Sequence, residues 1–202
     1  MTQINFWDSR YASEDFVYGT EPNGFLREQA PRLPTGAEVL CLAEGEGRNA
    51  TYLAGLGLRV TGVDASRVGM DKAQRLALER GVALTTVVAD LAEYDPGVDG
   101  WDAIVSIFAH LPPSIRTPLR ERIRTAIRVG GVFILEHYHP RQLDYRTGGP
   151  SDAALMSTLE ELDGEFDGWE CLHRFEGERD VVEGALHHGV AYVTQFVAKR
   201  LR

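Results

Sequence analysis

Two kinds of apolar segment alternate along the first two thirds of the chain. Short runs rich in β-branched residues predict strands, and most are nearly continuous in apolar residues, as is typical of strands covered on both faces. The predicted strands are Glu38–Leu42, Arg59–Val63, Ala83–Val88, Ala103–Ile107 and Val132–Glu136. The stretches between them predict helices at Gly47–Leu56, at Ser66–Arg80 with Ser66 as the N-cap, and at Pro112–Arg128. This alternation predicts a parallel sheet with right-handed crossovers.

The alternation ends after Pro140, where a glycine-containing loop leads to a helix predicted near Ser151–Asp163. Two strand-like stretches follow, Gly168–Phe175 and Gly189–Lys199, and nothing helical separates them, so they are expected to pair as an antiparallel hairpin. The predicted fold is α/β: a Rossmann-like three-layer sandwich around a seven-stranded, mostly parallel sheet with a C-terminal antiparallel hairpin. Residues 1–202 are expected to form one domain, in which residues 1–35 contribute an N-terminal helix.

Composition narrows the function classes. The net charge of −9 and the absence of a long basic stripe argue against nucleic acid as a partner, because binding to phosphates needs clustered cations. The basic residues of Arg116–Arg128 fall mostly on one helix face. The chain shows neither an apolar signal core nor a run long enough to span a membrane, so the cytoplasm is the expected compartment. The two cysteines have no metal-ligand spacing, and no metal is expected.

A glycine loop follows the first predicted strand directly. Gly45 and Gly47 stand between that strand and the next helix, where glycine permits a tight turn and a close approach of ligand to backbone. Asp64 ends the second strand, twenty residues beyond Glu44, a spacing that suits a carboxylate accepting hydrogen bonds from ribose hydroxyls. Asp90 follows the third strand, where an adenine amino group could donate to it. In the alternative interpretation, both aspartates only cap helices or turns.

The loop also matches the dinucleotide pattern G-x-G-x-x-A, so its nucleotide must be decided by other residues. Glu44 and Glu46 flank the glycines, where carboxylates would repel a pyrophosphate but suit the sulfonium and ammonium groups of S-adenosylmethionine. Arg48 partly offsets this charge. The Tyr-x-x-x-Lys pair of short-chain dehydrogenases is absent, and a terminal hairpin is foreign to a dinucleotide fold. These features favour S-adenosylmethionine over a nicotinamide dinucleotide.

With these features in place, the chain resembles the class I S-adenosylmethionine-dependent methyltransferases, in particular the small bacterial branch related to tellurite-resistance and thiopurine methyltransferases. The resemblance covers nearly the whole chain. It is carried by FWDSRYASEDFVYGTEPNGFL, AEGEGRN, VTGVDAS, VVADL, WDAIVSIFAHLP, QLDYRTGGP and HHGVAYVTQFVAKR.

The resemblance implies a role for each matching position. The glycines would lie against the methionine part of the cofactor, Asp64 would hold the ribose, and an N-terminal lid would close over the site. The expected cofactor-binding residues are Trp7, Arg10, Tyr11, Tyr18, Gly19, Glu44, Gly45, Glu46, Gly47, Asn49, Asp64, Ala65, Ser66, Asp90, Leu91, Ser106, Ile107 and Phe108.

Two positions depart from the family's usual pattern. The family usually carries an acidic residue inside the first strand, where this chain has Cys41, and a glycine where it has Ala43. Either Glu44 or Glu46 could supply the missing carboxylate from the loop.

The acceptor side is expected after the fourth and fifth strands. His110 and His137 are the candidate catalytic residues, because histidine titrates near neutrality and can serve as a base. Tyr138, Arg141 and Arg146 are the candidate acceptor-binding residues, the arginines being suited to an anion. Thiols, chalcogen oxyanions and other small metabolites remain open as acceptors, and a soft nucleophile needs little help beyond alignment with the methyl group.

Two rival functions remain at this point. One is a nicotinamide-dependent oxidoreductase, favoured only by the glycine pattern. The other is a module that binds S-adenosylmethionine or S-adenosylhomocysteine without catalysis, suggested by Cys41 and Ala43. The sequence is compatible with a monomer or a homodimer.

Overall fold

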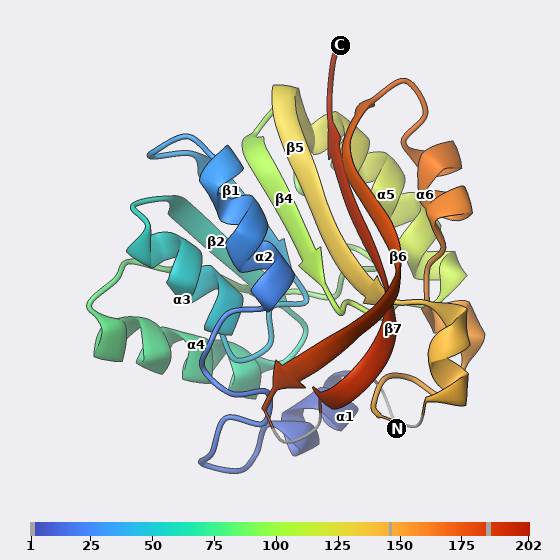
Figure 1. The fold of residues 1–202 in the computed structure, drawn as a ribbon. Coiled ribbons are helices and arrows are strands. Elements are labelled where there is room, and N and C mark those ends of the chain that lie inside the picture. Colours follow the sequence, from blue (N-terminus) through green and yellow to red (C-terminus); the bar gives the residue numbers. More distant parts are fainter. Residues whose placement is uncertain (1–2, 146, 185–186) are drawn as a thin grey trace.

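A seven-stranded sheet forms the centre of the protein (Figure 1). The structure is a computed structural model that describes residues 3–145, 147–184 and 187–202. The strand order is β3-β2-β1-β4-β5-β7-β6. The strands are β1 Glu38–Leu42, β2 Arg59–Asp64, β3 Thr85–Val88, β4 Trp101–Ile107, β5 Ile127–Tyr138, β6 Glu170–Glu183 and β7 His187–Lys199. Strands β1 to β5 pair in parallel, whereas β7 pairs antiparallel with both β5 and β6, which confirms the predicted fold.

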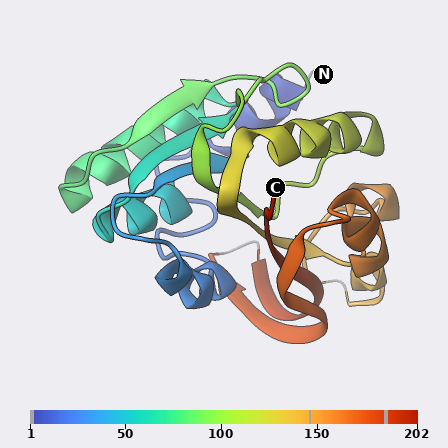
Figure 2. The same ribbon diagram turned by 90° about the horizontal axis from the view of Figure 1, so that it is seen from above.

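Helices cover both faces of the sheet (Figures 1 and 2). The α-helices are α1 Gln3–Arg10, α2 Gly24–Gln29, α3 Arg48–Gly55, α4 Arg67–Arg80, α5 Pro113–Ala126 and α6 Leu159–Glu165. Short 3-10 helices lie at η1 Ala30–Arg32, η2 Pro140–Asp144 and η3 Ala153–Leu155. Among the described residues no helix is long and apolar enough to cross a bilayer.

Alternate residues of the central strands face opposite cores, because side chains of a strand point to its two faces in turn. In β1, Val39 and Cys41 join the core under α2 and α3, while Leu40 and Leu42 join the core under α5 and α6. All four side chains are buried. This two-sided burial explains why the strand reads as an unbroken apolar run in the sequence.

The segment predicted as one helix near Ser151–Asp163 is instead two short helices, η3 and α6. The break falls at Thr158, whose extended backbone and side chain cap the new helix α6. Thr158 accepts from the amide of Glu161, and the Glu161 side chain accepts from the amide of Thr158, which forms a capping box. The local hydrogen bonds of this cap outweigh continuation of the first helix.

The glycine loop packs unusually close to α4. Gly47, the residue before α3, has φ +88°, and a Cβ atom placed on it would lie 2.5 Å from Cβ of Ala73. Gly57 has a similar φ of +82°, but a Cβ placed there would meet nothing within 4 Å. A comparison of Gly47 with Gly57 therefore separates the free-energy cost of a positive φ from the cost of the close approach to Ala73.

We expect Gly47→Ala to destabilise the protein more than Gly57→Ala. Both substitutions place alanine in the left-handed region, at a cost of roughly 1–2 kcal/mol. Gly47→Ala adds a steric overlap worth a further ~1–3 kcal/mol. Urea unfolding of both variants measures the difference, and equal losses of unfolding free energy would show that α4 simply moves away.

Candidate functional site

A cavity of about 530 Å³ lies at the carboxyl ends of β1, β2 and β4, where open α/β sheets bind ligands. Its volume falls within the range of small-molecule sites. Most of the residues expected to bind the cofactor or to act in catalysis line it. These are Trp7, Arg10, Tyr11, Tyr18, Gly19, Glu44, Gly45, Glu46, Asn49, Asp64, Ala65, Asp90, Leu91, Ile107, Phe108 and His110.

Several other expected site residues do not line the cavity. Gly47 packs against α4, and Ser66 caps α4, where its hydroxyl accepts from the amide of Gly69. Ser106, His137 and Tyr138 lie behind the wall and are buried. Arg146 lies outside the described residues.

Asp64 joins the glycine loop to the start of α4. One carboxylate oxygen accepts from the amide of Gly45 at 2.9 Å, and the other accepts from the amide of Ser66 at 2.8 Å. The side chain is buried, and this burial raises the pKa of its carboxyl. Asp64 therefore orders the backbone, as the capping interpretation holds, and also lines the cavity, as the ribose interpretation requires.

Glu44 is directed beneath the loop toward the start of α3. One of its oxygens accepts from the amides of Asn49 and Ala50, at 3.0 and 2.8 Å, which satisfies two donors of the helix N-terminus. Burial raises the pKa of its carboxyl to about 7. The same carboxyl contacts the Cys41 thiol and raises the pKa of that thiol, in addition to the larger effect of burial. Of the two loop glutamates, Glu44 is thus the one beside the strand position where the family usually has an acid.

Glu46 is directed the other way, toward the N-terminal segment. Its carboxylate accepts from the amides of Val17 and Tyr18, at 2.8 and 3.3 Å, and forms an ion pair with Lys72. The negative charge expected to attract the cofactor is therefore compensated inside the protein.

Asp90 is exposed at the rim of the cavity and also makes a turn. Its carboxylate accepts from the amide of Ala92 at 2.9 Å. The neighbouring Leu91 is buried and lines the same part of the wall. Asp90 thus makes a turn, as the capping interpretation holds, and also lies at the cavity, as the adenine interpretation requires.

Two non-glycine residues with left-handed backbone line the cavity. Ala43, at the position where the family usually has glycine, has φ +49°, and Phe108 has φ +52°. Such strain is retained mainly where function requires it. At Phe108 it turns the chain just after β4, so that Phe108, Ala109 and His110 line the cavity in succession.

The far end of the cavity is aromatic and apolar. Phe108, His110, Leu111 and Leu155 form it, together with residues 148–151. His110 donates from Nδ1 to the carbonyl oxygen of Leu155 at 3.3 Å, since that oxygen can only accept. In the neutral ring this bond makes Nε2 the acceptor.

Tyr138 supports this wall from behind. Its ring stacks on that of His110, with centroids 5.4 Å apart and planes at 12°. A Cβ on Gly149 would lie 2.7 Å from the Tyr138 ring, so the loop that contains Gly148 and Gly149 also packs against this tyrosine. Tyr138 thus contributes to the acceptor end through the residues that it supports.

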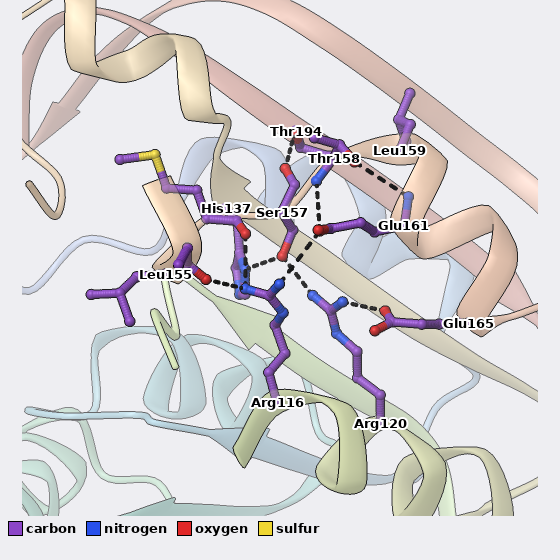
Figure 3. Close-up of polar contacts among 12 residues, drawn as sticks. Arg116, Arg120, His137, Leu155, Ser157, Thr158, Leu159, Glu161, Glu165 and Thr194 are labelled. Atoms are coloured by element: carbon purple, nitrogen blue, oxygen red, sulfur yellow. Dashed lines mark hydrogen bonds and ion pairs between the residues drawn. The ribbon is translucent and has the colours of Figure 1, made fainter. Parts of the chain in front are cut away.

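His137 lies one layer deeper than His110. Its Nε2 is 3.2 Å from Oγ of Ser106. Its Nδ1 is 3.3 Å from Oγ of Ser157 (Figure 3). Burial strongly lowers the pKa of the ring, and the nearby His110, Arg120 and Arg116 lower it further. His137 is thereby placed as a neutral support of the wall, away from the cavity in which it was expected to act.

Two buried arginines of α5 hold the segment that carries Leu155, a role that no local sequence pattern indicated. Arg116 donates to the carbonyls of Ala154 and Met156, at 2.9 and 2.8 Å. Arg120 donates to Oγ of Ser157 at 2.6 Å and pairs with Glu165 (Figure 3). In the sequence these arginines resemble an ordinary basic helix face, because their partners lie 37 to 45 residues away.

Arg141 does not reach the cavity. Its guanidinium lies 4.6 Å from the centre of the Tyr192 ring and donates to that tyrosine's hydroxyl at 3.2 Å. The side chain is exposed. Arg141, which was expected to attract an anionic acceptor, therefore forms a cation–π pair with Tyr192 at the surface.

A buried polar network joins the hairpin to the glycine loop, and it too was missed. Asn23 donates to Glu136 at 2.5 Å and to Glu183 at 2.7 Å. Arg48 pairs with Glu183 at 2.5 Å, and Arg179 pairs with both carboxylates. Because Asn23 and Glu136 are 113 residues apart, no local pattern could have revealed the network.

Comparisons with known proteins agree with this geometry. Residues 39–131 match the family model of a methyltransferase domain. The comparisons support a class I S-adenosylmethionine-dependent methyltransferase. A relative, the thiopurine S-methyltransferase of Xanthobacter autotrophicus (strain ATCC BAA-1158 / Py2), is 32% identical over 117 residues. That alignment covers 55% of this chain and 53% of the relative, so the chain spans about half the length of this curated protein.

Solved structures of similar fold cover nearly the whole chain. A protein studied for conversion of a disulfide bond into a thioacetal group during echinomycin biosynthesis has a TM-score of 0.79 at 18% identity, over 100% of this chain and 94% of that one. TehB from Haemophilus influenzae has a TM-score of 0.74 at 18% identity, over 98% and 66%. A TehB-like S-adenosylmethionine-dependent methyltransferase from Corynebacterium glutamicum ATCC 13032 Kitasato has a TM-score of 0.63 at 22% identity, over 97% and 95%.

The match to a methyltransferase domain decides between the two nucleotides considered for the glycine loop. The cofactor of the family is S-adenosylmethionine, and the dinucleotide interpretation is not supported.

We expect the ionisation of Glu44 to make stability depend on pH. Its pKa is about 7 in the folded protein against an ordinary 4.5, so the folded state binds the proton more tightly than the unfolded state. The contribution of Glu44 to the free energy of unfolding is therefore fully present below pH 4.5 and is lost as the pH rises through 7. The loss is about 3 kcal/mol, since one pKa unit corresponds to ~1.4 kcal/mol.

Urea unfolding of the wild type and of Glu44→Gln between pH 4.5 and 8 checks this expectation, because other titrating groups cancel in the difference. Glu28→Gln, at an exposed position of α2, is the control and should follow the wild type. Parallel curves for the wild type and Glu44→Gln would contradict the assignment.

Proposed function

We propose that the protein transfers the methyl group of S-adenosylmethionine to a small-molecule acceptor, and that residues 1–202 act as one methyltransferase domain. The observation that carries the proposal is the position of Asp64, a buried carboxylate that lines the cavity while holding the glycine-loop backbone at Gly45. Most of the other residues expected to bind the cofactor line the same cavity.

The lining residues fit this cofactor. A Cβ atom on Gly45 would lie 2.6 Å from the hydroxyl of Tyr11, so glycine at this position lets Tyr11 pack against the loop at the cavity wall. Gly45 would lie against the methionine part, Asp64 would accept from the ribose hydroxyls, and Asp90 with Leu91 would contact the adenine edge. When bound, the cofactor supplies a methyl group activated by its positively charged sulfur.

The far end of the cavity would hold the acceptor. Its wall of Phe108, Leu111 and Leu155 is apolar and would keep water from the reacting atoms. Alignment of the acceptor with the methyl group accounts for most of the catalysis in such a displacement, up to ~7–11 kcal/mol. Ile107 ends β4 and Phe108 follows it; both line the cavity and would form the floor where cofactor and acceptor meet.

The wall chemistry supports a soft nucleophile, a thiol or a chalcogen oxyanion, as the acceptor. Such a group attacks without a strong base, and His110 is the residue placed to take up the proton of a thiol. The name of one relative, thiopurine S-methyltransferase, agrees with a thiol acceptor. The cytoplasmic location and the monomer or homodimer state stay predictions.

We expect Asp64→Asn to weaken binding of S-adenosylhomocysteine at least tenfold, because a neutral amide accepts the ribose hydroxyls less strongly than a carboxylate. Isothermal titration calorimetry measures the dissociation constant. Asp71→Asn, an exposed position on α4, is the matched control and should bind as the wild type does. An unchanged dissociation constant for Asp64→Asn would remove Asp64 from the cofactor site.

A methyl-transfer screen tests the acceptor class, with formation of S-adenosylhomocysteine as the readout. We expect turnover with small aromatic or aliphatic thiols or with tellurite and selenite, and a reduced kcat for thiols in His110→Gln at an unchanged KM for S-adenosylmethionine. Turnover only with amines or alcohols would contradict the soft-nucleophile assignment. Tight S-adenosylhomocysteine binding without turnover across the panel would favour a non-catalytic module.

A further inference from the structure

The cavity is covered on one side by a segment without regular structure, residues 11–18, here named the strap. Tyr11 and Tyr18, at its two ends, both line the cavity, and their rings meet edge to face at 6.3 Å. The backbone between them is neither helix nor strand. Backbone amides and carbonyls that leave regular structure need other partners where they are shielded from water, so the question is what holds the strap in place.

Lys72 of α4 binds the carbonyl side of the strap. Its ammonium donates to the carbonyls of Asp15 at 2.7 Å, Ser13 at 3.0 Å and Tyr11 at 3.4 Å. The side chain is 6% exposed and lies against the ring of Phe16, 5.1 Å from its centre. One buried ammonium thus donates to three alternate carbonyls of a segment that lacks the regular backbone hydrogen bonds of a helix or strand.

Glu46 of the glycine loop binds the amide side of the same strap. Its carboxylate accepts from the amides of Val17 at 2.8 Å and Tyr18 at 3.3 Å. It also pairs with Lys72, and both side chains of this pair are almost fully buried. Lys72 therefore attaches the strap to α4, and Glu46 attaches it to the glycine loop. The two opposite charges also neutralise each other.

We propose that the Lys72–Glu46 pair is a positioning device that holds the strap, and with it Tyr11 and Tyr18, against the bound cofactor. Lys72 does not line the cavity, so its effect passes through the strap. A buried ion pair contributes little net stability, because desolvation offsets its attraction, but removing one partner is costly because the other charge stays buried and unpaired. Removing the cation frees three carbonyls at once and leaves the carboxylate without its counter-charge.

The experiment compares Lys72→Met with Arg75→Met. Arg75 lies nearly one turn further along the same helix and also reaches the strap, where it donates to the carbonyl of Glu14 at 3.2 Å, but its side chain is 47% exposed. We expect Lys72→Met to bind S-adenosylhomocysteine at least tenfold more weakly, and Arg75→Met to stay within about twofold of the wild type, since exposed contacts contribute little.

Trypsin cleavage after Arg10, at the start of the strap, supplies a second readout. S-adenosylhomocysteine should slow this cleavage in the wild type and in Arg75→Met, and should slow it much less in Lys72→Met. A residue that only stabilised the fold would lower the melting temperature without removing the protection by ligand.

The double variant Glu46→Gln with Lys72→Met keeps the test valid if Lys72→Met fails to fold, because it restores charge balance without restoring the contacts to the strap. It should fold, bind the ligand weakly and remain open to trypsin. Wild-type affinity and ligand protection in either Lys72 variant would overturn the proposal. Absence of binding by the wild type itself would instead overturn the proposed function.

Discussion

The buried carboxylate of Asp64 accepts hydrogen bonds from the amides of Gly45 and Ser66. It thereby joins the segments that follow β1 and β2. The cavity depends on this junction, because it sets both the path of the glycine loop and the start of α4. With the loop fixed there, Gly47 can lie against Ala73 and Glu46 can reach the strap. A change at Asp64 therefore acts on the shape of the site as well as on contacts with a ligand.

Buried charge recurs around this junction in a consistent pattern. Each carboxylate of the loop region accepts backbone amides: Asp64 from the loop, Glu44 from α3 and Glu46 from the strap. Burial of an acid is expensive unless such donors surround it, and here the donors are amides that regular structure leaves unpaired. The acids thereby make an irregular, glycine-rich surface rigid enough to bind a cofactor.

Local patterns predicted the sheet well and the site in part. Strand β1 was predicted with its observed bounds because burial on both faces leaves an apolar run, and Asp64 was found because its spacing from the loop is short. The direction of each glutamate could not be read from sequence, since Glu46 and Lys72 meet only when α4 folds back on the loop. Arg141 was misplaced for the same reason, since its partner Tyr192 lies 51 residues away.

The tip of the hairpin closes the site from the opposite end of the chain. Gly184, in the turn between β6 and β7, approaches the strap so closely that a Cβ atom on it would lie 2.5 Å from the carbonyl carbon of Tyr18. During synthesis, the contact between Tyr18 and Gly184 can form only after Gly184 has left the ribosome. At usual elongation rates this is on the order of ten seconds after Tyr18 has been made. The site can only be completed after residue 184 has been made, and a product truncated before that residue would leave it open.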